Sequence, residues 1–185
     1  MLLTIFNEIS DKRRGQGRMY ELSNVILFTV FAILSGADSY RKVETYITEN
    51  FKKLKKKFKL KWKKPPGYTT IRNIIQGVNS VELEKAFRKY SKAIACLNPD
   101  EYIFLGLDGK TARSSFDNFN DKKAVQTLSA FMSGTNIILA HQKVSKCKEN
   151  EIEAAKIIFQ ELKMENKILF TLDALHCQKK LLKPQ

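Results

Sequence analysis

Apolar side chains recur at helical spacing through the first half of the chain. Residues 25–34 form an almost unbroken apolar run, with Ser23 placed to cap its start and Gly36 to end it. Ser39 is a second candidate cap, and the apolar residues after it follow at intervals of three and four: Val43, Ile47, Phe51, Leu54 and Phe58. This pattern predicts a buried helix followed by a long amphipathic helix.

Two shorter helices are predicted beyond Pro65-Pro66-Gly67, a sequence that ends the long helix. Thr69 or Thr70 would cap the first of them, and Ser80 would cap the second. Because only "GVNS" separates the two, they could form a helix-turn-helix with Arg72 and Asn73 exposed to DNA. An ordinary helical hairpin explains the same spacing equally well.

The pattern changes to strands after Asn98-Pro99-Asp100. We expect an apolar strand at residues 103–107 that ends at Asp108, and strands at 122–133 and 137–144 joined by a turn at 134–136. A helix over about residues 151–163 and an apolar strand at 168–172, which ends at Asp173, complete the series. The prediction is therefore α + α/β: a helical domain over residues 1–98, then an incomplete RNase H-like mixed sheet over residues 99–185.

Two aspartates, Asp108 and Asp173, each stand at the end of an apolar strand in this prediction. Paired carboxylates held rigidly by strands can bind the divalent cations of a phosphoryl-transfer site. Each residue also has a structural interpretation, because Asp108-Gly109 is a hairpin-turn signal and Asp173 could cap a helix. The order of strand, hairpin, helix and strand between the two acids favours the metal site.

The charge of the chain is strongly positive and unevenly distributed. The net charge is +14, of which residues 1–100 contribute +11 through 20 basic and 9 acidic residues. Such a basic half is typical of a module that binds a polyanion, although lysine-rich surfaces also serve solubility. Nine lysines and no acid lie between Lys52 and Lys64, interleaved with Phe51, Phe58 and Trp62, so we expect this stretch to bind DNA phosphates. The candidate DNA-binding residues are Arg13, Arg14, Lys52, Lys53, Lys55, Lys56, Lys57, Lys59, Lys61, Lys63, Lys64, Arg72, Lys110 and Arg113.

Cysteine and hydropathy patterns bear on the compartment. The three cysteines are an odd number without zinc-site spacing, which argues against a disulfide framework and fits a reducing compartment. The apolar run at 25–34 resembles the core of a signal peptide, but acidic residues precede it and a bilayer span takes about 20 residues. We expect a cytoplasmic, nucleoid-associated protein with no membrane partner.

Three separated motifs resemble one protein family. "GLDGKTARSS" around Asp108 and "TLDALHCQKK" around Asp173 are similar to the two aspartate blocks of the DDE transposases of the ISAs1 insertion-sequence family, which overlaps the H-repeat-associated proteins. The segment "DKRRGQGRMYELSNVILFTVFAILSGADSYRKVETY" resembles the domain that precedes the catalytic core in that family. The resemblance covers nearly the whole chain in the family's order.

The resemblance implies metal-dependent cleavage and joining of DNA phosphodiester bonds. Asp108 and Asp173 would be the catalytic ligands of Mg²⁺ or Mn²⁺, and Lys110 and Arg113 would lie beside the DNA phosphates. The partner would be double-stranded DNA, both insertion-sequence ends and target, and the protein could act as a homo-oligomer. The family's third acid, a glutamate on a later helix, has no match in these 185 residues. We therefore expect a truncated copy that is inactive alone, with a non-catalytic DNA-binding remnant or regulator as the alternative.

Overall fold

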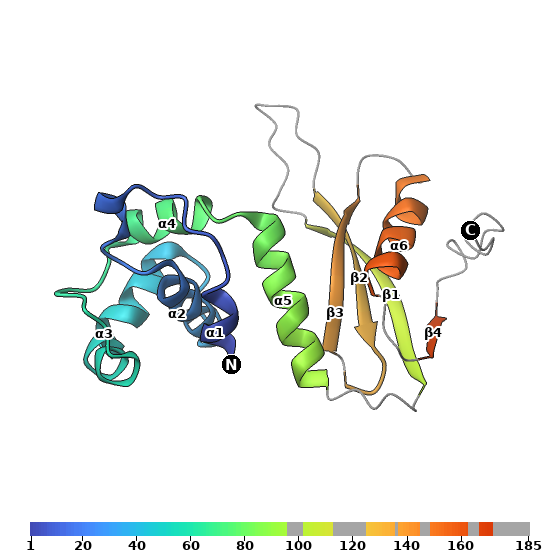
Figure 1. Ribbon diagram of the computed structural model, residues 1–185, viewed down its shortest axis with the longest axis horizontal. Helices are drawn as coiled ribbons and strands as arrows, with labels where there is room; N and C mark the ends of the chain where they lie inside the picture. The colour runs from blue at the N-terminus through green and yellow to red at the C-terminus, as the bar shows by residue number, and fades with distance from the viewer. Residues whose placement is uncertain (96–101, 113–124, 136, 145–148, 163–166, 172–185) are drawn as a thin grey trace. The chain divides into compact units, whose positions relative to one another are not determined.

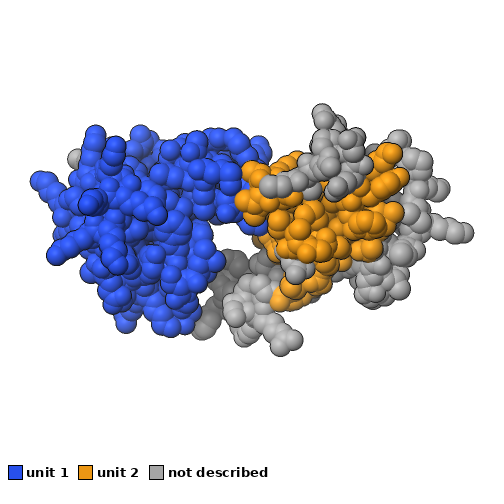
Figure 2. Space-filling model, turned by 90° about the horizontal axis from the view of Figure 1, so that it is seen from below, with its two compact units in different colours: residues 1–90 blue, residues 91–185 orange. Residues whose placement is uncertain are grey.

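The computed structural model describes residues 1–95, 102–112, 125–135, 137–144, 149–162 and 167–171. The chain divides into two compact units, Met1–Tyr90 and Ser91–Gln185 (Figure 2). Each unit has its own hydrophobic core, so each is described by itself.

The first unit is helical, as the sequence predicts (Figure 1). Its elements are α1 (Leu2–Phe6), the 3₁₀ turn η1 (Gly15–Arg18), α2 (Leu22–Leu34), α3 (Tyr40–Phe58), α4 (Tyr68–Gln76) and the first part of α5 (Ser80–Ala95). Among the described helices, none combines the length and the apolar character that a membrane span requires.

Of the two predicted ends of α2, the start differs from the prediction and the stop agrees with it. Glu21 is the N-cap residue, whereas Ser23 is the second residue of the helix and is buried, so the predicted cap at Ser23 is wrong. The predicted stop at Gly36 is confirmed. Gly36 adopts a φ of 93°, its N–H donates to the Ile33 carbonyl at 2.9 Å, and the Ala37 N–H donates to the Ala32 carbonyl at 2.9 Å. These two hydrogen bonds satisfy carbonyl groups in the last turn of the helix.

The long amphipathic helix is also confirmed as α3, but it ends at Phe58, with Lys59 as a left-handed C-cap, and not at the predicted stop Pro65-Pro66-Gly67. The Ser39 hydroxyl accepts a hydrogen bond from the Lys42 N–H at 3.4 Å, which satisfies one free donor of the first turn. Val43, Ile47 and Leu54 are buried along one stripe. The helix therefore contributes one apolar face to the core and leaves its opposite face to the lysines.

The caps of α4 and α5 lie one or more residues before the predicted ones. Gly67 precedes α4, and the Asn79 side chain caps α5 by accepting from the Val81 N–H at 3.0 Å. Asn79 therefore replaces Ser80 because its longer side chain reaches the free N–H groups from one residue earlier. The main packing partners of α4 are α2 and α3, to which it adds Ile71 and Ile74, so the two short helices do not pack on each other as the hairpin alternative would require.

The second unit contains a mixed four-stranded sheet, in agreement with the predicted change of pattern. Its strands are β1 (Ile103–Ala112), β2 (Val125–Met132), β3 (Ile137–Val144) and β4 (Ile168–Thr171), in the order β3-β2-β1-β4. The β1–β2 and β2–β3 pairs are antiparallel, and β1 and β4 are parallel. Helix α6 (Glu149–Glu161) connects β3 with β4 and packs on β2 and β3 (Figure 1).

The main difference from the prediction concerns β1. Asp108 lies inside the strand instead of at its end, because β2 pairs with β1 from Leu105 as far as Ala112. The predicted turn signal at Asp108-Gly109 is overridden by this pairing. Gly134, with a φ of 90°, forms the turn between β2 and β3.

At Gly106 a side chain of the neighbouring strand lies against the backbone of β1. Gly106 lies opposite Phe131 on β2, and a Cβ at Gly106 would be 2.3 Å from the Phe131 ring. The ring therefore lies directly over the glycine on the face of β1 that also carries Asp108. Only a residue without a side chain permits this contact.

We expect Gly106→Ala to lower the free energy of unfolding of the second unit by about 1–3 kcal/mol, because the new methyl group must displace the Phe131 ring. Urea denaturation followed by circular dichroism measures the loss. Gly15→Ala is the control, since a Cβ there meets no atom within 4 Å. Equal stability of the two variants would contradict the proposed steric contact.

Candidate functional site

Asp108 occupies a half-exposed position in the middle of β1. It points to the face opposite the buried Leu105 and Leu107, and its side chain is 48% exposed. Lys110 follows on the same face, with its Nζ 3.4 Å from Asp108 Oδ2. The lysine is almost fully exposed, so this ion pair leaves the carboxylate accessible to other ligands.

Ser129 and His141 lie in the same cross-strand row as Asp108. Asp108 is paired with Ser129 on β2, and Ser129 is paired with His141 on β3. The Ser129 Oγ lies 3.0 Å from His141 Nδ1. Sequence analysis missed this row: the alternation of each strand places these residues on one face, but the register between strands depends on a bulge at Ala130/Phe131.

Other predicted residues of this site lie outside the described part of the chain. These are Asp173 and Arg113, and β4 is described as far as Thr171. Within the described residues, no group of three or more carboxylate, histidine or cysteine side chains could hold a metal ion. Asp108 and Lys110 are therefore the members of the predicted catalytic set whose positions the structure gives.

The lysines between Lys52 and Lys64 are all exposed, as predicted. The aromatic residues among them point the other way. Trp62 is only 1% exposed, its Nε1 donates to the Glu21 carboxylate, and its ring packs against Tyr20 and Phe28 at centroid distances of 5.0 and 5.7 Å. The expectation that aromatic side chains share a DNA-binding surface with the lysines is therefore wrong for Trp62, because burial of the indole stabilises the core.

The lysines from Lys52 to Lys57 belong to α3, and the residues after them are held against the end of that helix. Lys59 adopts a left-handed backbone conformation with φ 52°, and the Leu60 N–H donates to the Lys55 carbonyl at 3.1 Å. The Lys55 ammonium donates to the Trp62 carbonyl at 2.7 Å. Lys55 is thus partly structural, whereas most of the other lysines have no hydrogen bond or ion pair among the described residues: Lys52, Lys53, Lys56, Lys59, Lys61, Lys63 and Lys64.

The two predicted arginines near the N-terminus differ in their surroundings. Arg13 donates to the Asp11 carboxylate through Nε at 2.8 Å and Nη2 at 2.7 Å, and also to the carbonyls of Gly17 and Tyr20. Arg14 is exposed. This segment is a hydrogen-bonded turn in which most donors of Arg13 are occupied.

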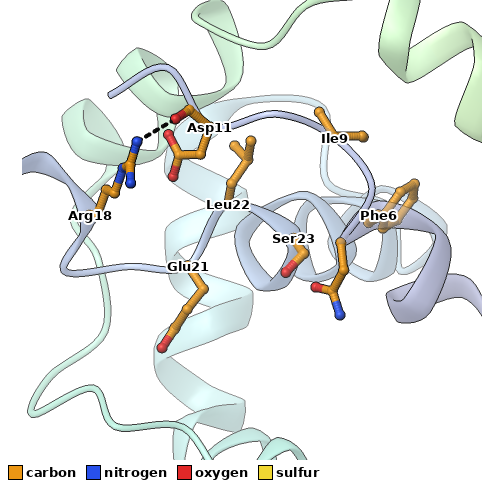
Figure 3. A pocket seen from close by; sticks show the side chains of 8 residues that line it. Phe6, Ile9, Asp11, Arg18, Glu21, Leu22 and Ser23 are labelled. Atoms are coloured by element: carbon orange, nitrogen blue, oxygen red, sulfur yellow. Dashed lines mark hydrogen bonds between the residues drawn. The ribbon is translucent and has the colours of Figure 1, made fainter. Parts of the chain in front are cut away.

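A shallow pocket lies beside this turn, at the start of α2 (Figure 3). Figure 3 shows Asp11 and Arg18 joined by a hydrogen bond at one side, with the Glu21 side chain pointing away from them. Arg18 Nη2 donates to the Asp11 carbonyl at 2.6 Å, and Glu21 accepts from Trp62. The charged groups of the pocket are engaged in holding the turn and the core, so the pocket offers no evident chemistry.

Arg72 lies on the exposed face of α4, opposite the buried Ile71 and Ile74. In the described part of the chain, its guanidinium forms no hydrogen bond or ion pair. The guanidinium is therefore accessible to a ligand.

The chain is similar to proteins described as transposases. Residues 3–91 match the DDE_Tnp_1-associated family. The chain is 32% identical over 178 residues to "Putative transposase YncI" of Escherichia coli O157:H7, covering 96% of this chain and 44% of that protein. It is 32% identical over 167 residues to the protein of the same name in strain K12, covering 90% and 65% of the two chains. It is 27% identical over 171 residues to "H repeat-associated putative transposase YhhI" of strain K12, covering 92% and 44%.

The chain therefore spans about half to two thirds of the length of the relatives it matches. No solved structure shows significant similarity to it.

The Asp11–Arg13 contact makes a specific contribution to acid sensitivity. The hydrogen bond from the Arg13 side chain holds the pKa of Asp11 below its usual value of 3.8. A lowered pKa means that the carboxylate stabilises the folded unit above about pH 4 and that this contribution disappears as the pH falls further. We expect Asp11→Asn to be less stable at pH 7 and to lose less stability than the parent between pH 5 and pH 3. Urea denaturation at several pH values measures this, and parallel pH profiles would contradict the assignment.

Proposed function

Because this chain belongs to the DDE transposase family that includes the H repeat-associated proteins, we propose that it takes part in transposition through two separate sites. Residues 1–98 form a DNA-binding domain. Residues 99–185 form the first part of a catalytic core, in which Asp108 and Asp173 bind a divalent metal ion. Membership of the ISAs1 subgroup is part of this proposal.

The register of the parallel strands is the observation that carries the catalytic part. The first four residues of β1 are each paired with the residue 65 positions later on β4, from Ile103 with Ile168 to Gly106 with Thr171. If this offset held for two more residues, it would pair Asp108 with Asp173. Partners in parallel strands point to the same face and are about 4.8 Å apart, so both carboxylates could share one ion.

The arrangement of the sheet supports an RNase H-like core. An antiparallel run of β1, β2 and β3 is followed by α6 and then by β4, which returns parallel to β1 on its other side. This is the strand, hairpin, helix and strand order that the sequence predicts for the start of that fold. It puts the first and fourth strands side by side in the sheet.

Asp108 suits the metal that the family implies. Carboxylate oxygens are the ligands that Mg²⁺ and Mn²⁺ prefer, and the Asp108 carboxylate is half-exposed with one long ion pair to Lys110. A bound ion would supply Lewis-acid stabilisation of charge on a phosphodiester. Lys110 and Arg113 would place positive charge next to the DNA backbone.

The reaction of the whole family protein would be cleavage and joining of insertion-sequence DNA. These 185 residues contain no match to the third acid, and a metal ion with too few ligands is poorly positioned. We therefore propose that the 185-residue polypeptide binds DNA and metal but does not cleave DNA by itself.

The DNA-binding part rests on exposed positive charge. Seven lysines of the 52–64 segment are exposed without a described partner, and the ordered turn at Lys59 holds the end of the segment against α3. Uncompensated charge of this density repels itself, and neutralisation by phosphates relieves the repulsion. The unit can therefore bind duplex DNA without base contacts.

We expect duplex DNA binding to depend less on salt in a variant that has Gln in place of Lys52, Lys53, Lys56 and Lys63. The slope of log affinity against log salt should become less negative by about 0.9 for each lost phosphate contact. Fluorescence anisotropy at several salt concentrations measures the slope. The matched control removes four exposed lysines elsewhere: Lys85, Lys92, Lys143 and Lys156. If both quadruple variants change the slope equally, net charge and not the segment explains the binding.

We expect Mn²⁺ to broaden NMR signals of the backbone amides around both Asp108 and Asp173, because a paramagnetic ion relaxes nearby nuclei. Asp108→Asn should remove the effect at both segments, whereas Asp38→Asn in the first unit should not. Broadening at one aspartate only would exclude a shared ion.

Cleavage of element-end DNA by the 185-residue polypeptide, abolished by Asp108→Asn, would show that two acids suffice and would contradict the proposed inactivity.

A further inference from the structure

Helix α4 carries a polar face that the core does not use. Thr69, Arg72, Asn73 and Gln76 are all exposed and follow one another at intervals of three, one and three residues. Residues at this spacing lie on one side of a helix. The opposite side holds the buried Ile71 and Ile74, so the polar face points to solvent.

The chemistry of this face is unusual for a helix that only meets water. It contains an arginine, an asparagine and a glutamine, and α4 has no acidic residue. Within the described residues, none of these three side chains forms a hydrogen bond or ion pair. Arginine makes paired hydrogen bonds to guanine, and asparagine or glutamine makes them to adenine, in the major groove of DNA.

The surroundings of α4 provide positive charge and rigidity. Lys61, Lys63 and Lys64 are exposed on the segment that leads into the helix. Arg41 stacks on the Tyr68 ring with its Cζ 5.2 Å from the centroid, which ties the start of α4 to α3. Because α4 also packs on α2 and α3, its exposed face is held by a formed core.

The start of α4 itself is not the phosphate site. The Glu44 carboxylate lies beside Gly67, with Oε1 3.7 Å from the position that a Cβ would take. A carboxylate there occupies the positive end of the helix dipole and repels a second anion. Phosphate contacts therefore fall to the lysines, and the side chains of α4 are left for another role.

We propose that α4 is a base-reading helix that enters the major groove of duplex DNA, with Arg72, Asn73 and Gln76 in contact with base edges. This rests on the proposed DNA-binding function and adds sequence specificity to it. Helix α4 has nine residues and is about 14 Å long, which is enough to cross the groove. The geometry differs from a helix-turn-helix of α4 and α5, since α4 packs mainly on α2 and α3.

The test is selection of preferred sites from a library of random duplexes by the 185-residue protein, followed by measurement of affinity for the selected and scrambled sequences. Each paired base contact discriminates by roughly 5- to 150-fold. Two variants are compared: Arg72→Ala alone, and Asn73→Ala combined with Gln76→Ala. We expect each variant to relax the base preference at particular positions of the DNA site. The quadruple lysine variant should lower affinity for all sequences alike and keep the preference.

Arg72→Lys separates base reading from charge. A lysine retains the positive charge but not the planar pair of donors. Base reading predicts that Arg72→Lys relaxes the sequence preference while the salt dependence stays unchanged. Full preference in Arg72→Lys and in the Asn73/Gln76 variant would overturn the proposal.

The outcomes of the selection also separate this proposal from the proposed function. Duplex binding without any preferred sequence would overturn base reading by α4 and leave the DNA-binding function intact. No duplex binding at all would overturn both. Thermal denaturation of each variant verifies that it is folded, and because the changed side chains are exposed, we expect melting temperatures close to that of the parent.

Discussion

Burial of Trp62 is the interaction on which the surface of the first unit depends. The indole packs against Tyr20 and Phe28 and donates to Glu21, so the segment after α3 is held against the core at its centre. The lysines on either side of Trp62 must then face solvent, because the alternating residues of the segment point away from the core. The same segment leads into α4 and brings its start beside Arg41. One buried aromatic side chain thus positions both the lysines proposed to bind phosphates and the helix proposed to read bases.

In the second unit, β1 has the corresponding role. It is paired on both sides, with β2 and β4, and it is the strand that carries Asp108. Buried Leu105 and Leu107 fix one face of β1 to the hydrophobic core that also contains residues of α6. Asp108 and Lys110 therefore lie on the opposite face of the strand. The contact of Phe131 with Gly106 lies on that second face and closes the space next to the aspartate. A carboxylate held in this way keeps its position when a cation binds, as a phosphoryl-transfer site requires.

The two sites make different demands on the chain. Phosphate binding needs exposed charge and tolerates mobile side chains, because the interaction is long-ranged and not directional. Metal binding and base reading need side chains placed by a rigid backbone, since a displacement of about 1 Å is costly. The lysines accordingly occupy a helix end and a connecting segment, whereas Asp108 is in a paired strand and Arg72 in a helix packed on two others.

Local patterns in the sequence determined most elements of this protein. The stripe from Val43 to Phe58, the stop at Gly36 and the strand at 137–144 agree with the structure, because each depends on neighbours within a few residues. The motifs around Asp108 and Asp173 also indicate the transposase family, in agreement with the similarity to a relative over 96% of the chain. Tertiary structure decided what depends on distant partners. Pairing with β2 extended β1 through the apparent turn at Asp108, burial turned the Trp62 ring into the core, and the strand register set Ser129 and His141 in a row with Asp108. Packing of α4 on α2 and α3 left its polar face free. No single segment contains this information, because register, burial and packing are properties of two segments in contact.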